Sequence, residues 1–192
     1  MRSVRKLLNS KAFALIYSLT NGKKNKKIRE ILLKEQKKIC AYTESYIGRE
    51  DGGEIDHFNP ELKGKPEDGY HNYFVIKSQW NKEKNDHWDL FQPILHPTDE
   101  ELEKRICFNP KEARFYTDPT DLEANNLVNF LNLNDPDLIR QRKLYLERKR
   151  KEIERFKESP EEHFKTLLIE EPKAVYYIRA INETFNINVF NE

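Results

Sequence analysis

Residues 54–84 constrain the fold of this chain more than any other stretch. Residues 55–58 form a short stretch with an apolar residue at each end, stopped by Asn59-Pro60, and residues 73–76 are aromatic and β-branched, so both are predicted to be strands. Between them, residues 64–69 carry the glycine and proline that are typical of turns. Ser78 then offers a hydroxyl that can cap a helix. The stretch is therefore predicted to fold as strand, loop, strand and helix.

Four polar residues in this stretch form a pattern suited to hydrolysis of a phosphodiester. Asp56 and His57 come at the end of the first predicted strand, and Asn81 comes on the first turn of the helix. Histidine titrates near neutral pH, so His57 is the candidate general base. Asp56 and Asn81 supply hard oxygen ligands, which favour Mg²⁺ or Mn²⁺ over zinc. Asn72 is expected to bond across the loop and to hold His57 in one tautomer.

The sequence Asp56-His57, followed by Asn72 and then by Asn81 with Lys84 behind it, resembles the HNH endonuclease motif of the ββα-metal fold. The match is to the variant of this motif whose third residue is asparagine. The resemblance implies a metal-dependent endonuclease that hydrolyses phosphodiester bonds of nucleic acid. It implies Asp56 and Asn81 as metal ligands, and His57, Asn72 and Asn81 as catalytic residues.

The charge of the chain gives no global signal for nucleic acid. The 192 residues are 35% charged, but the formal net charge is only +1. Any basic surface must therefore be local. Lys77, Lys82 and Lys84 surround the predicted helix start and are the candidate phosphate contacts. Glu54, an additional carboxylate, and His71, a second histidine, are secondary candidates for the site.

The two cysteines, Cys40 and Cys107, are far apart and are expected to be reduced thiols. Many HNH proteins hold a structural zinc with two cysteine pairs, but Thr43 stands where the partner of Cys40 is expected. A tetrahedral zinc site needs four ligands, so we predict no structural zinc. No apolar run is long enough to span a bilayer, and a signal-peptide core is lacking. We therefore expect a cytoplasmic protein without a membrane partner.

The fold class expected for the chain is α+β, mainly α. A small ββα-metal nuclease core is predicted to lie between N-terminal helices and a C-terminal helical region, as one compact unit. The predicted parts are N-terminal helices at residues 1–38, the HNH core at 39–90, an irregular and hairpin connection at 91–120, and a helical region at 121–192.

Apolar spacing predicts the elements outside the core. In residues 1–38, apolar residues recur at helical spacing on both sides of a break at 20–22, which predicts two helices. Residues 106–110 and 113–116 predict a short hairpin. Further helices are predicted at residues 121–131, at 138–156, after Ser159 and after Pro172.

Several segments together sharpen the resemblance. They are similar to the HNH nuclease subunit of bacterial anti-phage systems of the Septu and retron-associated type, often called PtuB. These segments are residues 32–44, 54–60, 71–84, 108–118 and 131–143. In that family the nuclease works with an ATPase partner. The resemblance therefore implies an antiviral defence role, such a partner, and a nucleic-acid substrate, with DNA favoured over RNA.

Two alternatives stay open. The ββα module could be a catalytically inactive binding or assembly domain, with the helical tail docking a partner protein. A weaker alternative is an all-helical interaction protein in which the pair Asp56-His57 is incidental. Metal-dependent nicking by the isolated chain would exclude the first, and strands in the fold would exclude the second.

Overall fold

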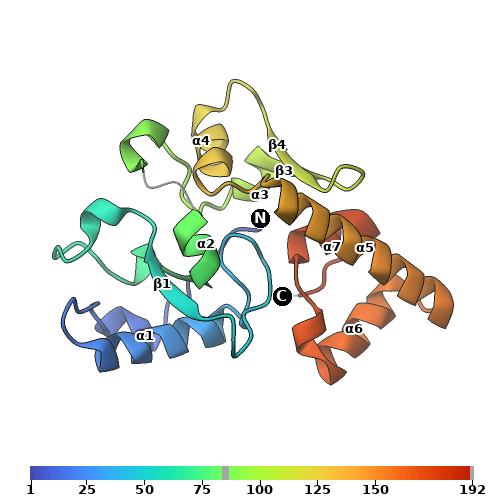
Figure 1. Cartoon of the computed structure of the whole chain (residues 1–192), viewed down its shortest axis with the longest axis horizontal. Helices are drawn as coiled ribbons and strands as arrows, with labels where there is room; N and C mark the ends of the chain where they lie inside the picture. The colour runs from blue at the N-terminus through green and yellow to red at the C-terminus, as the bar shows by residue number, and fades with distance from the viewer. Residues whose placement is uncertain (84–86, 191–192) are drawn as a thin grey trace.

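In the computed structural model, which describes residues 1–83 and 87–190, a small two-stranded sheet and a short helix lie between an N-terminal helix and a group of C-terminal helices (Figure 1). The helices together with two small antiparallel sheets confirm a mainly helical α+β class. The strands also exclude the all-helical alternative. That the first sheet and its helix are an HNH core stays a prediction.

The first sheet pairs β1 (Gly53–His57) with β2 (Tyr73–Lys77), and α2 (Ser78–Glu83) follows directly, in the predicted order. Ser78 is the first residue of α2 and not its cap, so that detail of the prediction is wrong. Its hydroxyl donates instead to the carbonyl of Gly52 at 2.8 Å. Gly52 has a φ of +60°, and a Cβ there would lie 2.7 Å from the Ser78 oxygen, so the turn needs glycine.

The antiparallel register decides which side chains share a face of this sheet. Asp56 pairs with Phe74, and His57 pairs with Tyr73. Side chains alternate along a strand, so the neighbours Asp56 and His57 face opposite sides. Tyr42 lies on the side of Asp56 and Phe74, with its ring centroid 5.8 Å from that of Phe74.

Each face of the first sheet is covered. Helix α1 (Gly22–Glu35) covers the face of His57, where Leu33 lies beside Gly53. The face of Asp56 continues into a cluster of aromatic rings, in which Phe58 and Phe130 each lie 5.4 Å from Trp88. These rings are buried, and they make the sheet the centre of the hydrophobic core.

The second sheet is the predicted short hairpin. Helix α3 (Leu102–Arg105) leads into β3 (Ile106–Asn109), which pairs antiparallel with β4 (Arg114–Thr117). Helix α4 (Leu122–Phe130) follows, and the Asp121 side chain caps it by accepting from the amide of Ala124. This unit packs on the aromatic cluster through Phe130 of α4, whose ring lies against Trp88 of the 3₁₀ turn η4 (Trp88–Phe91).

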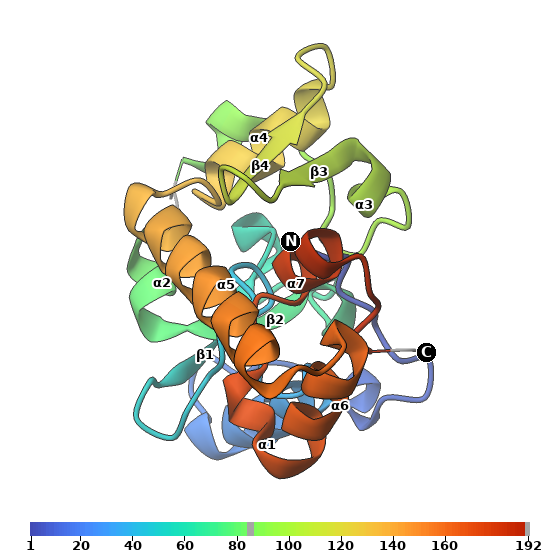
Figure 2. The same cartoon turned by 90° about the vertical axis from the view of Figure 1, so that its right-hand side faces the viewer.

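Three C-terminal helices lie together on one side of the molecule (Figures 1 and 2). They are α5 (Pro136–Phe156), α6 (Pro160–Glu170) and α7 (Ile178–Phe185). Asp135 caps α5. Ser159 and Glu162 form a reciprocal capping box on α6, which follows Ser159 as predicted. Pro172 opens only a short 3₁₀ turn, so the last helix begins later than predicted.

The 3₁₀ turns are η1 (Lys11–Ala14), η2 (Pro60–Leu62), η3 (Tyr70–Asn72), η4 (Trp88–Phe91) and η5 (Pro172–Ala174).

The first of the two predicted N-terminal helices is wrong. Before α1 the chain is irregular apart from η1. Its backbone amides bond to side chains of the core: Leu7 donates to the Tyr70 hydroxyl at 2.9 Å, and Tyr17 donates to the Tyr73 hydroxyl at 3.1 Å. These tertiary bonds replace the local bonds of a helix.

No helix in the described part of the chain has both the length and the apolar character needed to cross a membrane.

Candidate active site

Asp56 is buried on β1 and accepts a hydrogen bond from Tyr42. Its exposed fraction is 5%, and the Tyr42 hydroxyl donates to Oδ2 at 2.5 Å. Burial, and after it the neighbouring Asp56 carboxylate, hold the pKa of Tyr42 well above its ordinary value. Tyr42 is therefore a neutral donor at physiological pH, and it fixes the orientation of the Asp56 carboxylate.

Asn81 lies beside Glu54. Its side-chain nitrogen donates to Glu54 Oε2 at 2.8 Å, which turns the amide toward β1. Glu54 and Asp56 are two residues apart on the same strand, so their carboxylates share one face. The structure therefore brings the candidate ligand Asn81 next to the secondary candidate Glu54, which is two residues from Asp56 on β1.

These three side chains have the donor chemistry of a site for a hard cation. Two carboxylates and one amide oxygen are ligands that Mg²⁺ or Mn²⁺ accepts. Within the described residues, no group of three or more His, Cys, Asp or Glu side chains has metal-ligand spacing. A cation held by Asp56 and Asn81, with Glu54 beside them, would need water to complete its shell. Mg²⁺ ordinarily keeps several waters, so the residues present fit it.

His57 is the last residue of β1, and three side chains enclose it. The edge of the Tyr17 ring lies against it with centroids 4.6 Å apart, and Tyr73 lies 5.2 Å away. Asp68 approaches its Nε2 at 3.2 Å. The exposed fraction of His57 is 5%. The candidate base is thus paired with a carboxylate and covered by the N-terminal segment.

Asn72 bonds across the loop between the strands. Its side chain accepts from the Asn59 amide at 2.8 Å and donates to Asp68 at 3.0 Å. Asn72 therefore reaches His57 through Asp68. The sequence analysis missed Asp68 because it lies in a turn rich in glycine and proline, where an acidic residue is ordinary. Its spacing of four residues before Asn72 carries no signal without the fold.

The candidate phosphate contacts differ in their surroundings. Lys77 is half-buried and forms an ion pair with Asp51 at 3.1 Å. Lys82 is exposed on α2, and His71 is exposed on the turn before β2. Lys84 falls outside the described residues.

Lys6 is a half-buried cation that the sequence analysis did not single out. Its amine donates to the carbonyl of Tyr73 and lies 4.0 Å from the centroid of the Phe74 ring. Burial lowers the pKa of Lys6 to about 7, against the opposing effect of Glu35. A lysine thus supports the strand opposite His57 while titrating near neutrality.

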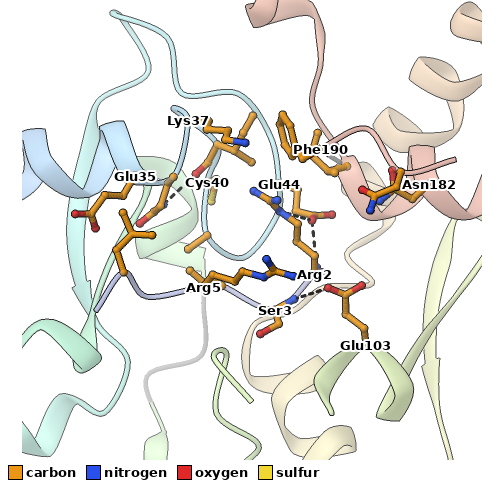
Figure 3. Close-up of a pocket in the computed structure, with 17 residues that line it drawn as sticks. Arg2, Ser3, Arg5, Glu35, Lys37, Cys40, Glu44, Glu103, Asn182 and Phe190 are labelled. Carbon is orange, nitrogen blue, oxygen red and sulfur yellow. Dashed lines mark hydrogen bonds and ion pairs between the residues drawn. The ribbon is translucent and has the colours of Figure 1, made fainter. Parts of the chain in front are cut away.

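Glu44, another carboxylate near the motif in sequence, has a structural role elsewhere. It is buried beside a cavity of about 260 Å³ between the N-terminal segment and α7 (Figure 3). Its two oxygens accept from the backbone amides of Arg2 at 3.1 Å and Arg179 at 3.2 Å. Glu44 therefore joins two distant segments of the chain.

The cysteines Cys40 and Cys107 are both free thiols. Trp80 and Tyr42 are both buried, and the indole of Trp80 donates to the carbonyl of Leu131 at 3.1 Å. The expected lack of a structural zinc stays a prediction.

Comparison of the chain with protein-family models, with curated proteins and with solved structures gives no match. The geometry of the site and the sequence motif therefore carry the functional argument.

Proposed function

We propose that this chain is a metal-dependent endonuclease of HNH type that hydrolyses phosphodiester bonds, with DNA favoured over RNA. The observation that supports it most is that β1 carries both a set of oxygen ligands and a histidine paired with a carboxylate. Glu54, Asp56 and Asn81 offer oxygen ligands, and His57 is paired with Asp68 at the end of the same strand. Phosphodiester hydrolysis needs both a base for water and positive charge at the phosphate.

In this mechanism each residue has a separate task. His57 accepts a proton from the attacking water. Asp68 stabilises the imidazolium that forms and fixes the ring, and Asn72 holds Asp68 in place. Asp56 and Asn81 would hold the cation. When bound, Mg²⁺ or Mn²⁺ stabilises the charge that develops on the phosphate and on the leaving oxygen.

The mechanism also requires movement of the N-terminal segment. Tyr17 lies edge-on against His57, and its amide donates to the Tyr73 hydroxyl. A water and a phosphate reach His57 only when Tyr17 moves aside. We therefore propose that the enclosed His57 is a resting state and that substrate or partner binding exposes it.

The wider role that we propose is the effector of a bacterial anti-phage defence system, acting in the cytoplasm with an ATPase partner. Its support is the Septu-type resemblance, together with apolar side chains that a partner could cover. Within residues 7–19, five large apolar side chains are exposed by 47–96%. They are Leu7, Leu8, Phe13, Ile16 and Leu19. Protein-binding surfaces commonly expose such side chains.

The second candidate function is an inactive binding or assembly module. The burial of His57 and the exposed apolar residues of the N-terminal segment favour it over an enzyme that works alone. The two candidates differ in one outcome, which is metal-dependent hydrolysis of nucleic acid.

The test is cleavage of plasmid and single-stranded DNA by the purified chain in Mg²⁺, Mn²⁺ or EDTA. We expect cutting in either metal that EDTA abolishes. His57→Ala should reduce it by about 10²–10⁴-fold, the usual contribution of a general base. His87→Ala, at an exposed histidine outside the proposed site, is the matched control and should cut like the wild type.

Undiminished cutting by His57→Ala would show that His57 is not the base. Absence of cutting by the wild type, both alone and with a co-purified ATPase, would favour the binding module.

A further inference from the structure

Two adjoining hollows run from the end of α1, across the turn after α6, and along α5. The first has a volume of about 850 Å³, and the second about 390 Å³. Tyr46 and Lys173 line both, so we describe them as the two parts of one groove. In Figure 2 the chain after α6 lies over α1, where the first part is found. We call it the lysine groove and define it by Lys34, Lys38, Tyr46, Arg148, Lys173 and Tyr176.

The groove concentrates positive charge. Among its lining residues, six are cationic and two are acidic, whereas the whole chain has a formal net charge of +1. The cations are Lys34, Lys37, Lys38, Lys77, Arg148 and Lys173, and the acids are Glu170 and Glu171. The second part has no acidic lining residue among those that the structure describes. A local excess of this kind attracts polyanions although the protein is nearly neutral.

Most of these cations are available to a ligand. Lys34, Lys38 and Arg148 are exposed, and no carboxylate in the described ranges forms an ion pair with them. Lys173 lies 3.5 Å from Glu171, but both side chains are more than half exposed. An exposed pair of this kind contributes little and exchanges readily for a phosphate.

Two tyrosines lie among the cations. Tyr46 lines both parts of the groove, and Tyr176 lines the second. Both are half-buried, and the Tyr176 ring packs against Tyr145 with centroids 4.2 Å apart. This packing holds the Tyr176 ring in place. Alternating cations and aromatic rings are the usual means by which proteins bind unpaired strands, because each base can stack on a ring.

The groove ends at one end of the first sheet. Its last cation is Lys77, which pairs with Gly53 across that sheet. Glu54 follows Gly53 on the same strand, and its side chain points to the other face. We propose that the lysine groove binds a single-stranded stretch of the nucleic acid that the candidate active site cuts. The inference rests on the proposed nuclease function and adds the form of its substrate.

Binding without cleavage tests the inference. The probe is a fluorescein-labelled oligothymidine, titrated in EDTA at several salt concentrations and followed by fluorescence anisotropy. The groove variant combines Lys38→Glu, Arg148→Glu and Lys173→Glu. The matched control combines Lys111→Glu, Lys151→Glu and Lys165→Glu, which are exposed lysines that do not line the groove. The two triple variants carry the same net charge.

We expect the groove variant to bind about tenfold more weakly than the control. The slope of log Kd against log salt should also fall by about 2, because three contacts to a single strand are lost. Equal binding by the two triple variants would overturn the proposal. Circular dichroism checks folding, and the single exposed substitution Lys38→Glu should shift binding in the same direction if the triple variant fails to fold.

The tyrosine variants test the strand form. Tyr46→Leu should weaken binding of the oligothymidine about fivefold or more, whereas Tyr46→Phe should retain it, because stacking needs the ring and not the hydroxyl. Binding of a blunt duplex should not respond to either change. Equal responses of duplex and single strand would show that the groove holds phosphates only, and would refute the single-stranded assignment.

The inference and the proposed function can fail separately. His57→Ala should bind the oligothymidine like the wild type even where cleavage is lost. Groove binding without any metal-dependent cleavage would contradict the nuclease and leave the groove as a binding site. Cleavage that is insensitive to the groove variant would contradict the groove and leave the nuclease.

Discussion

Lys6→Met should change how the stability of the protein depends on pH. The Lys6 amine donates to the carbonyl of Tyr73 and lies over Phe74. Burial lowers its pKa from 10.5 to about 7, and Glu35 partly opposes this effect. Methionine has a similar length and no charge, so it keeps the packing and removes the titration.

The sign and size of the effect follow from proton linkage. Between the folded pKa of about 7 and the unfolded value of 10.5, the unfolded chain holds a proton that the folded chain lacks. The free energy of unfolding therefore rises with pH in this window and levels off below about pH 7, where both states hold the proton. Lys6 is half protonated in the folded state at pH 7, so its contribution to the rise from pH 7 to pH 9 is about 2.3 kcal/mol.

Urea denaturation of wild type and Lys6→Met at pH 7 and pH 9 measures this directly. The wild type should gain about 2 kcal/mol more than the variant on going to pH 9. Lys111→Met, at an exposed lysine, is the control and should behave like the wild type. A wild-type gain equal to that of Lys6→Met would refute the argument, because it would mean that Lys6 titrates alike in both states.

Three further predictions concern the site. Tyr42→Phe removes the hydroxyl that donates to Asp56 and should lower the free energy of unfolding by about 1–3 kcal/mol; an unchanged urea midpoint would show that the bond contributes nothing. Asp68→Asn should slow metal-dependent cleavage about 100-fold and shift its pH profile, because an amide cannot stabilise the His57 imidazolium; an unchanged profile would contradict the pairing. Tyr17→Ala should speed the modification of His57 by diethyl pyrocarbonate, measured by mass spectrometry; equal rates would show that Tyr17 does not cover the ring.

Local signals in the sequence predicted much of the fold. The strand and turn residues of 54–84 predicted the first sheet and α2, although Ser78 bonds to Gly52 and does not cap the helix. The helices predicted at 138–156 and after Ser159 are α5 and α6, which Asp135 and the capping box of Ser159 with Glu162 begin. Such signals succeed because they depend on neighbours in the chain.

Features that depend on distant contacts could not be predicted in this way. The N-terminal segment has helical apolar spacing, yet Leu7 and Tyr17 bond to Tyr70 and Tyr73 in the core. The pairing of Asp68 with the candidate base depends on how a loop closes over the sheet. Neither contact leaves a local pattern in the sequence, because the partners are more than ten residues apart.

The geometry of β1 restricts how one phosphate can meet both halves of the candidate site. Asp56 and His57 are neighbours whose side chains face opposite sides, so only a group at the end of the strand, beyond His57, can approach both. The lysine groove approaches from Lys77, which pairs with Gly53 at the other end of the sheet. Four strand steps separate Gly53 from His57, a distance of about 13 Å. A substrate strand that enters by the groove must therefore continue for several nucleotides before it reaches the base, so oligonucleotides too short to span both features should bind without being cut.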